Sequence, residues 1–481
     1  MISQLFNSTS IVGRTTIAGL LLLAGSAAVQ AIPSIYPTGT TIYDPTKAYN
    51  SYVLFAGQDK KTHLIDLNGN VVHEWNYNAF PPVLIDPALN GGKRGHVLVQ
   101  LSGDTGGRAN ATTQSIGEVD WNGNVVWQWG GAGAQDAYAG NGTATDASGY
   151  GTSIRQHHDW RRLPNGNTVI LVNYVIPVKG WKADTLLEDA IFEVNPAGDV
   201  VWKWAAFEHL DELGFSETSL KILRESLTRN DKNLPFDYLH FNNLSVVGPN
   251  KWYDAGDQRF HPDNLLFDAR EANIIAIIDK KTGKIVWRIG PDYPPSIGQF
   301  KLPRPVDQIA GQHDAHIIPK GLPGAGNLLV FDNQGAAGYP PVNIGTQPRS
   351  RILEIDPVKK EIVWQYTGVD SGKPGYSFYS SYISSARRLP NGNTLIDEGM
   401  NGRLFQITSK GEIVWEYISP YFSTPRAEDP QQFSANTVYR AQPVPYDWVP
   451  EGTPRSEKAV NPIDIKTFRV NNLTDKNGGA Q

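Results

Sequence analysis

The 481-residue chain contains no cysteine. This absence excludes disulfides, thiolate catalysis and cysteine-ligated metal sites. The chain also has no block of basic residues, and its net charge is −5, which argues against nucleic acid or an anionic membrane surface as a partner. No apolar run reaches the roughly 20 residues that a bilayer-spanning helix needs. We therefore expect neither a membrane span nor a nucleic-acid partner.

The N-terminal residues carry a targeting pattern. Arg14 precedes the short apolar run 17–25, and the small-residue stretch 26–31 follows and ends in Val-Gln-Ala. This pattern predicts a cleavable signal peptide over residues 1–31, and hence a periplasmic or secreted protein. The alternative is a buried N-terminal helix, which the prolines and glycines behind it would leave isolated.

One phrase recurs six times along the chain: an apolar strand, a turn, and a second apolar strand that ends in tryptophan. Each phrase predicts a β-hairpin, because turn residues separate two apolar runs. We expect the tryptophans to pack between repeats. The phrases cover residues 63–75, 117–127, 191–202, 277–287, 352–364 and 404–415.

A second hairpin precedes several of these phrases. Residues 161–170 (RRLPNGNTVI) nearly duplicate residues 387–396 (RRLPNGNTLI), and residues 316–330 fit the same unit with a longer turn. Two hairpins make a four-stranded sheet, and six such sheets in series make a propeller. We therefore predict an all-β fold, a single six-bladed β-propeller over residues 32–481.

The spacing of the repeats is uneven, which predicts long inter-strand loops. Successive tryptophans lie about 50 residues apart at the two ends of the series and about 75 to 85 apart in its middle. We expect a short helix over residues 219–227, within the insertion 205–236, and a second long insertion over 248–264. The proline-rich, irregular tail, about 420–481, should pack on the propeller.

Five of the ten histidines fall in three short phrases, each just before the first strand of a predicted blade. Alignment of the repeats superposes His158 on His313, and His240 falls at the equivalent place between them; the last blade has Ser384 there. Because innermost strands start at one rim of the central channel, we expect three blades to present imidazoles to one pocket. The phrases are Gln156-His157-His158-Asp159, Asp237-Tyr-Leu-His240-Phe-Asn242 and Gly311-Gln-His313-Asp314-Ala-His316.

Two further polar residues extend this group. Asn242 stands two residues after His240, so the two share a side of an extended strand. Arg270 ends the second predicted strand of the same blade. An arginine among neutral imidazoles indicates an anionic, oxygen-rich ligand. Asp159 and Asp314 either orient a histidine ring or have only a structural role. The other five histidines are expected to be core or surface residues: His63, His73, His96, His209 and His261.

At these residues the chain resembles the bacterial arylsulfotransferase family. The resemblance spans nearly all of the sequence after residue 31. Its specific part comprises Leu239-His240-Phe-Asn242, Asp268-Ala-Arg270, Gln312-His313, Phe331-Asp332-Asn333 and Phe378-Tyr379-Ser380.

The resemblance implies transfer of a sulfuryl group from a phenolic sulfate ester to a phenol, without the nucleotide donor PAPS and through a covalent sulfohistidine. It implies His313 as the nucleophile, and places His240, Asn242, Arg270 and a further histidine around the sulfuryl oxygens. Of His157 and His158 we assign this role to His158, because it aligns with His313. We expect no cofactor and no metal, and only small-molecule partners, a phenolic donor and a phenolic acceptor; a homodimer is compatible with the sequence.

Three alternatives remain open. Several inward histidines could bind iron, as in carotenoid-cleaving oxygenases, although those have seven blades. Residues 279–287 resemble the tryptophan docking phrase of quinone-cofactor dehydrogenases, which have eight blades and a calcium site. The third alternative is a non-catalytic binding propeller, because the propeller fold alone decides no function.

Overall fold

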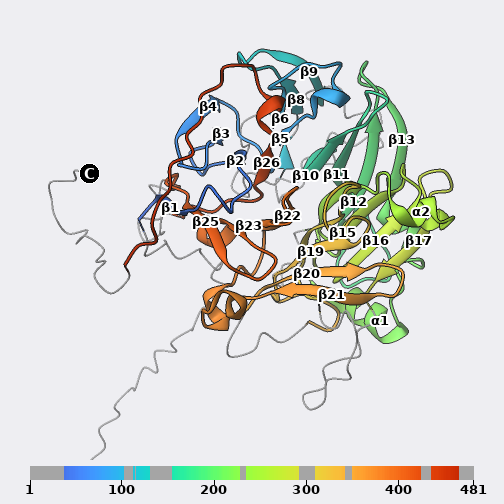
Figure 1. Ribbon diagram of the computed structural model, residues 1–481. Coiled ribbons are helices and arrows are strands. Elements are labelled where there is room, and N and C mark those ends of the chain that lie inside the picture. The colour runs from blue at the N-terminus through green and yellow to red at the C-terminus, as the bar shows by residue number, and fades with distance from the viewer. Residues whose placement is uncertain are drawn as a thin grey trace, which may run out of the picture.

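The computed structural model describes residues 37–101, 112–113, 115–130, 154–227, 235–291, 309–341, 349–423 and 435–464. Over these ranges the chain forms six antiparallel sheets of four or five strands. The sheets are arranged around a common centre as the blades of a β-propeller (Figure 1). The predicted six-bladed all-β fold is therefore confirmed, whereas the predicted signal peptide lies outside the described residues.

The blades are described in the order of the sequence, and the strands of each blade are listed from the innermost outward. Blade 1 has β26 (Gln442–Val444), β2 (Tyr52–Ala56), β3 (Thr62–Ile65) and β4 (Val71–Trp75). Blade 2 has β5 (Val83–Leu84), β6 (Val97–Gln100), β8 (Ser115–Val119) and β9 (Val125–Gly130). Blade 3 has β7 (Thr112–Thr113), β10 (Arg155–Arg162), β11 (Thr168–Pro177), β12 (Thr185–Val194) and β13 (Val200–Ala205).

The remaining blades complete the circle. Blade 4 has β14 (Phe241–Val246), β15 (Leu265–Ala269), β16 (Ile274–Ile278) and β17 (Ile285–Ile289). Blade 5 has β18 (His313–Ile317), β19 (Leu328–Asp332), β20 (Arg351–Asp356) and β21 (Glu361–Tyr366). Blade 6 has β22 (Ser385–Arg388), β23 (Thr394–Glu398), β24 (Arg403–Ile407), β25 (Ile413–Ile418) and β1 (Gly39–Tyr43). Each predicted tryptophan phrase thus supplies two outer strands of one blade.

Both ends of the described chain take part in ring closure. Strand β1 pairs with β25 at the outer edge of blade 6, and β26 pairs with β2 at the inner edge of blade 1. Part of the predicted tail is therefore a strand of the propeller itself. Additional pairing joins the two ends, because Tyr43 and Val460 exchange backbone hydrogen bonds of 2.8 and 2.9 Å.

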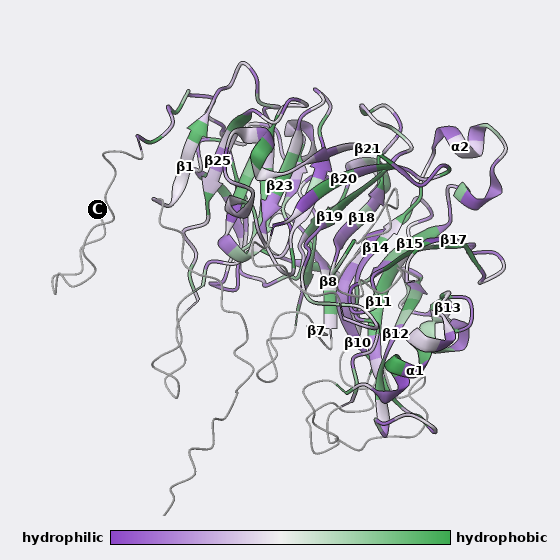
Figure 2. Ribbon diagram, turned by 90° about the horizontal axis from the view of Figure 1, so that it is seen from below, coloured by the Kyte–Doolittle hydropathy of each residue, from purple (hydrophilic) through white to green (hydrophobic). Residues whose placement is uncertain are grey.

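The hydrophobic core lies between the blades. Six apolar clusters each join the facing surfaces of two consecutive blades, and one of them, which contains Phe55 and Trp415, joins blade 6 to blade 1. The middle strands are buried on both faces, so β11 and β15 are largely apolar, whereas α2 (Lys251–Asp254) is largely polar (Figure 2). This packing explains why the predicted strands read as continuous apolar runs.

Among the described contacts, tryptophan side chains fasten five of the six blades to the next; in blade 2 the buried Nε1 of Trp127 has no hydrogen-bond partner. A buried indole N–H needs an acceptor, and in this propeller the acceptors are backbone carbonyls in the hairpin turns of the following blade. Four predicted tryptophans make this contact, while in blade 3 Trp204 makes it instead of the predicted Trp202. The pairs are Trp75 to Asp120 (3.0 Å), Trp204 to Gly283 (2.9 Å), Trp287 to Pro357 (2.7 Å), Trp364 to Ser409 (3.2 Å) and Trp415 to Leu67 (2.7 Å).

Helices occur only in the connections of the described chain. The first insertion contains α1 (Glu217–Glu225), as predicted; the hydroxyl of Ser216 caps it by accepting from the Ser219 N–H at 3.1 Å. The second contains α2. Short 3-10 turns occupy Pro87–Leu89, Ala206–His209, Gln258–Phe260, Gly368–Ser371, Gly375–Ser377, Gly399–Asn401 and Tyr446–Trp448. None of the described helices combines the length and apolar character that a membrane crossing requires.

Candidate active site

The innermost strands of blades 3, 4 and 5 are irregular where the histidine phrases lie. The pairing register shifts between Gln156 and Trp160 in β10, at the start of β14, and after His313 in β18. His158 and His240 both adopt left-handed backbone conformations, with φ of 56° and 54°. Bulges and positive φ values in non-glycine residues re-aim side chains and concentrate at functional sites.

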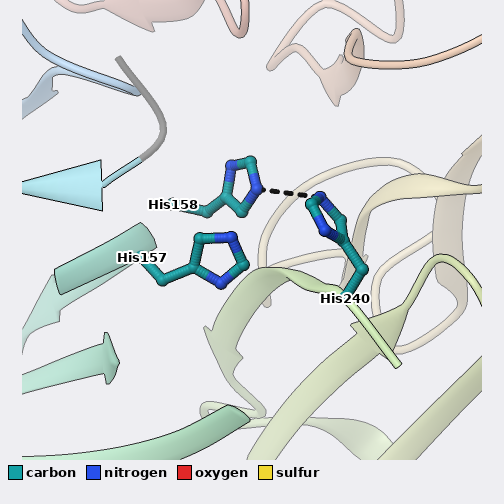
Figure 3. Close-up of side chains that lie close together, drawn as sticks. All are labelled: His157, His158 and His240. Carbon is teal, nitrogen blue, oxygen red and sulfur yellow. Dashed lines mark hydrogen bonds between the residues drawn. The ribbon is translucent and has the colours of Figure 1, made fainter. Parts of the chain in front are cut away.

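These irregularities bring three imidazoles together. The Nε2 atoms of His158 and His240 lie 3.1 Å apart. The ring of His157 lies beside them, with its centroid 4.1 Å from that of His158 and 5.1 Å from that of His240. Figure 3 shows the rings from β10 and from the residue before β14 facing one another. Two of the predicted site residues, His158 and His240, are thus in direct contact.

Two carboxylates hold the outer nitrogens of this cluster. Asp237 Oδ2 lies 2.6 Å from His240 Nδ1, and Asp189 Oδ1 lies 3.1 Å from His157 Nδ1. Burial alone would lower the pKa of His240, but the negative charge and hydrogen bond of Asp237 outweigh it and raise that pKa to about 9. His240 therefore carries a proton on each nitrogen near neutral pH, and its Nε2–H donates to His158.

His158 has the opposite electrostatic environment. Burial lowers its pKa well below the usual value, and the neighbouring rings of His157 and His240 lower it further. Because its Nε2 accepts the proton of His240, its own hydrogen is on Nδ1, a buried atom with no hydrogen-bond partner among the described residues. The contact therefore pairs a charged with a neutral imidazole.

His313 is fixed as a neutral ring with a defined tautomer. The amide of Asn333 donates from Nδ2 to the carbonyls of Ser380 (2.7 Å) and Ile383 (2.8 Å). Its Oδ1 must therefore accept, and it lies 2.8 Å from His313 Nδ1. The ring consequently carries its proton on Nδ1, and its Nε2 lone pair accepts the Ile383 N–H at 3.0 Å. Burial and then the charge of Arg270 lower the pKa of His313 well below its usual value.

Asn242 and Arg270, the two other predicted site residues, make hydrogen bonds close to His313 and to His240. Asn242 is fully buried and donates from Nδ2 to the carbonyl of Gln312 at 2.9 Å, so it links blade 4 to the residue before His313. Arg270 follows β15, and its backbone N–H donates to the His240 carbonyl at 3.0 Å. Its guanidinium pairs with Glu271, while its buried Nε has no partner in the described part of the chain.

An aromatic wall from distant parts of the sequence borders the site. Tyr439, just before β26, stacks on Phe80 with a centroid distance of 3.9 Å and on His158 at 5.1 Å. Its ring centroid is 6.3 Å from that of His313. The Tyr439 hydroxyl donates to the Asn242 carbonyl at 2.5 Å. Tyr439 therefore contacts both His158 and His313.

The two aspartates left undecided by the sequence prove to be structural. Asp159 pairs with Arg161 and, at 2.7 Å, with Arg440. Asp314 pairs with Arg387 and, at 3.1 Å, with Arg440. Among the described contacts neither carboxylate reaches a histidine ring; only the backbone carbonyl of Asp314 does, 2.8 Å from His316 Nδ1. Arg440, from the tail, thus braces blades 3 and 5 from the axis.

Sequence reasoning missed four residues that shape the site. Asp237 stands three residues before His240 in the same phrase, so that spacing was the available signal. Asn333 lies within a segment that resembles the family, but no role for it followed from the resemblance. Asp189 in β12 and Tyr439 before β26 had no local signal, because only the blade arrangement brings them to the histidines.

The fold and this site define a six-bladed β-propeller lined by buried histidines, with a partly buried arginine close to them. The sequence model of the arylsulfotransferase (ASST) family matches residues 52–440. The chain belongs to this family, and its general activity is aryl sulfotransfer. None of the curated proteins matches the chain.

Solved structures similar to the chain are distant. A protein of unknown function from Bacteroides caccae is 12% identical, with a TM-score of 0.45, and the match covers 82% of this chain and 99% of that chain. A streptogramin B lyase is 13% identical, with a TM-score of 0.36 and coverage of 81% and 84%. AztD from Citrobacter koseri is 9% identical, with a TM-score of 0.34 and coverage of 82% and 98%. Likenesses this distant say nothing of the activity of this chain.

Proposed function

We propose that the protein moves a sulfuryl group from a phenolic sulfate ester to a phenol, with His313 as the nucleophile and without a nucleotide donor. The observation that carries this proposal is the environment of His313. Asn333 keeps the proton on Nδ1, and burial keeps the ring neutral. A neutral imidazole with its lone pair on Nε2 is the nucleophilic form.

In the first step, His313 Nε2 attacks the sulfur of the donor. The N–S bond forms, the bond between sulfur and the phenolic oxygen breaks, and the departing phenolate takes a proton from His240 Nε2. The sulfur replaces the Ile383 N–H at the His313 lone pair. That N–H is then beside the transferred group and can donate to one of its oxygens.

Hydrogen-bond donors with fixed positions stabilise the charge on the sulfuryl oxygens. A loose, in-line transition state places charge on the three equatorial oxygens, as in phosphoryl transfer. Besides the Ile383 N–H, we assign this role to the Nε–H of Arg270, which has no partner among the described residues, and to the second N–H of the Asn242 amide; the charge of Arg270 already acts on the His313 ring. Donors that are already oriented cost no rearrangement when the charge develops.

The second step reverses the first with a different phenol. The acceptor oxygen attacks the sulfur of sulfohistidine, its proton returns to His240, and the N–S bond breaks to restore His313. Asp237 stabilises the charged form of His240 that both steps need. His158 shares the proton of His240, and the stacked rings of Tyr439 and Phe80 offer an apolar surface for a phenyl ring.

The same proposal includes the place of action. Residues 1–31 have the pattern of a signal peptide, and we infer that the enzyme works in the periplasm or outside the cell. Its partners are a small phenolic sulfate and a small phenol, with no nucleic acid or membrane partner.

A burst experiment tests the mechanism. Mixing the protein with a chromogenic aryl sulfate alone should release about one equivalent of phenol rapidly, and the intact mass should rise by one sulfuryl group. Added phenol should then give ping-pong kinetics. His313→Asn should abolish the burst. Equal phenol release by His313→Asn and the parent would refute the assignment of the nucleophile.

A further inference from the structure

The histidine cluster of blades 3 and 4 has the composition of a metal site. His157, His158 and His240 each offer a ring nitrogen, and these three atoms lie within 4.8 Å of one another. We propose that this cluster binds one late first-row transition-metal ion, of the class of Zn²⁺. The aryl sulfotransfer proposed above does not use such an ion, so this is a second ligand for the same part of the molecule.

The spacing of the nitrogens fits a tetrahedral ion. Zn–N bonds of about 2.0–2.1 Å at tetrahedral angles separate two ligand nitrogens by roughly 3.3–3.4 Å. The Nε2 atoms of His158 and His240 are 3.1 Å apart. Two ring nitrogens at this distance need a shared proton or a shared cation between them. A metal ion therefore enters this pair by replacing the proton, and the His157 nitrogen, within 4.8 Å of the other two, moves toward the ion as the third ligand.

The third ligand is already directed at the same point. Asp189 lies at Nδ1 of His157, and in Figure 3 the other ring nitrogen of His157 faces His158 and His240. Since β10 carries both His157 and His158, their relative position is set by the irregular backbone at that point. The three nitrogens thus approach one centre from two blades.

Two carboxylates stand behind the ligands. Asp189 and Asp237 contact the Nδ1 atoms of His157 and His240 at 3.1 and 2.6 Å. A carboxylate at the outer nitrogen is the usual support of a metal-bound histidine, because it orients the ring and increases its basicity. Three imidazoles without a carboxylate ligand favour Zn²⁺, Cu²⁺ or Ni²⁺ over Mg²⁺ and Ca²⁺.

Three protein ligands leave the fourth position of a tetrahedral ion open to water or an anion. An ion in this place would also remove the transferable proton of His240, so it should inhibit sulfuryl transfer. This inhibition rests on the proposed function, whereas binding of the ion does not.

A second histidine with acidic neighbours supplies a matched control. His63 lies near Asp59 and Glu74, and one ligand atom from each is also within 4.8 Å of the others. However, Asp59 contacts Nε2 at 3.0 Å and Glu74 faces Nδ1 at 3.3 Å, on opposite sides of the ring. The two carboxylates thus contact different nitrogens of the ring, so we expect no chelate there.

Zinc titration of the chelator-treated full-length protein tests the proposal. Calorimetry should show one Zn²⁺ bound per chain and no binding of Mg²⁺ at the same concentration. His157→Gln should weaken Zn²⁺ binding by roughly 100-fold or more, since even the loss of a supporting residue costs about 10- to 100-fold. His63→Gln should leave the affinity unchanged. Absence of Zn²⁺ binding, or loss of binding in His63→Gln alone, would overturn the proposal.

Two further measurements do not depend on the folding of one variant. Asp189→Asn should weaken Zn²⁺ binding by about 10- to 100-fold, because the ring of His157 loses its support. X-ray absorption of the zinc-loaded parent should count three imidazoles, and a count below two would refute the site. Aryl sulfate turnover is measured separately: zinc binding without turnover would support the metal site and overturn the proposed function, and turnover without zinc binding would do the reverse.

Discussion

Replacing Asn333 by alanine tests whether catalysis needs the tautomer of His313 with its proton on Nδ1, or only the presence of the imidazole ring. The change removes the acceptor at 2.8 Å from His313 Nδ1, but the Gly311 carbonyl remains at 3.1 Å from the same nitrogen. Loss of one such hydrogen bond is worth about 1 kcal/mol, or roughly five- to tenfold in the population of the correct tautomer. The Ile383 loop also loses its anchor. We therefore expect the burst rate to fall roughly 10- to 100-fold, because small misplacements of a reacting group cost up to about 10²-fold.

The same variant should be less stable. Asn333→Ala leaves the carbonyls of Ser380 and Ile383 without their donor, and an unsatisfied buried group costs about 1–3 kcal/mol. The expected loss in unfolding free energy is about 2–6 kcal/mol. Asn250→Ala is the matched control, because the buried Asn250 amide also donates to two carbonyls, those of Gly248 and Phe260, each at 2.8 Å.

Stopped-flow measurement of phenol release, well below the melting temperature of both variants, distinguishes an effect on the His313 tautomer from general destabilisation. Asn250→Ala should lose comparable stability and keep the parental burst rate. A normal burst in Asn333→Ala would show that the proton on Nδ1 is not needed. An equal loss in Asn250→Ala would show that the effect follows general destabilisation.

Three other changes are informative. Arg270→Lys keeps the charge but loses the planar fork, and should slow aryl sulfate turnover by about 10²-fold with little change in melting temperature; full turnover with unchanged substrate affinity would remove Arg270 from the site. Burial raises the pKa of Glu188 to about 8; the folded protein then binds the proton more tightly than the unfolded chain, so this group's contribution to stability falls as the pH rises from about 4.5 through 8. Glu188→Gln should lack this dependence, so its urea midpoint relative to the parent should rise between pH 5 and pH 8, and a constant difference would contradict the reasoning. Trp287→Phe loses the hydrogen bond to the Pro357 carbonyl and should cost about 1–3 kcal/mol in chemical denaturation with the burst rate retained; no loss would deny this indole its role between blades 4 and 5.

The repeating part of the fold could be predicted because its signals are local. Each tryptophan phrase contains its own strands and turn, and a set of similar sheets can only be stacked in series. Trp202 packs between blades 3 and 4 as predicted. That Trp204 rather than Trp202 donates the hydrogen bond to blade 4 was not predictable, because both indoles lie near the end of the same strand.

The site was predictable only where a blade carries its own signal. His158, His240 and His313 were found by aligning repeats, and the structure brings the first two into contact while the charge of Arg270 lowers the pKa of His313. Asn333 and Tyr439 depend on contacts between blades and with the tail, which no spacing in the sequence encodes. The direction of the Asn242 side chain depends on the irregular start of β14, which regular strand geometry does not anticipate.

The late position of the tail in the sequence has a consequence for biogenesis. Tyr439 and Arg440, which border the histidines and brace blades 3 and 5, precede β26, the strand that completes blade 1. A ribosome makes these residues after the other described strands. A nascent chain therefore contains every residue proposed to act on the sulfuryl group before the site that they form can be completed. Chains cut before residue 439 should therefore be inactive although His313 and Arg270 are intact. We therefore expect catalytic activity to appear only when β26, the strand that completes blade 1, is in place.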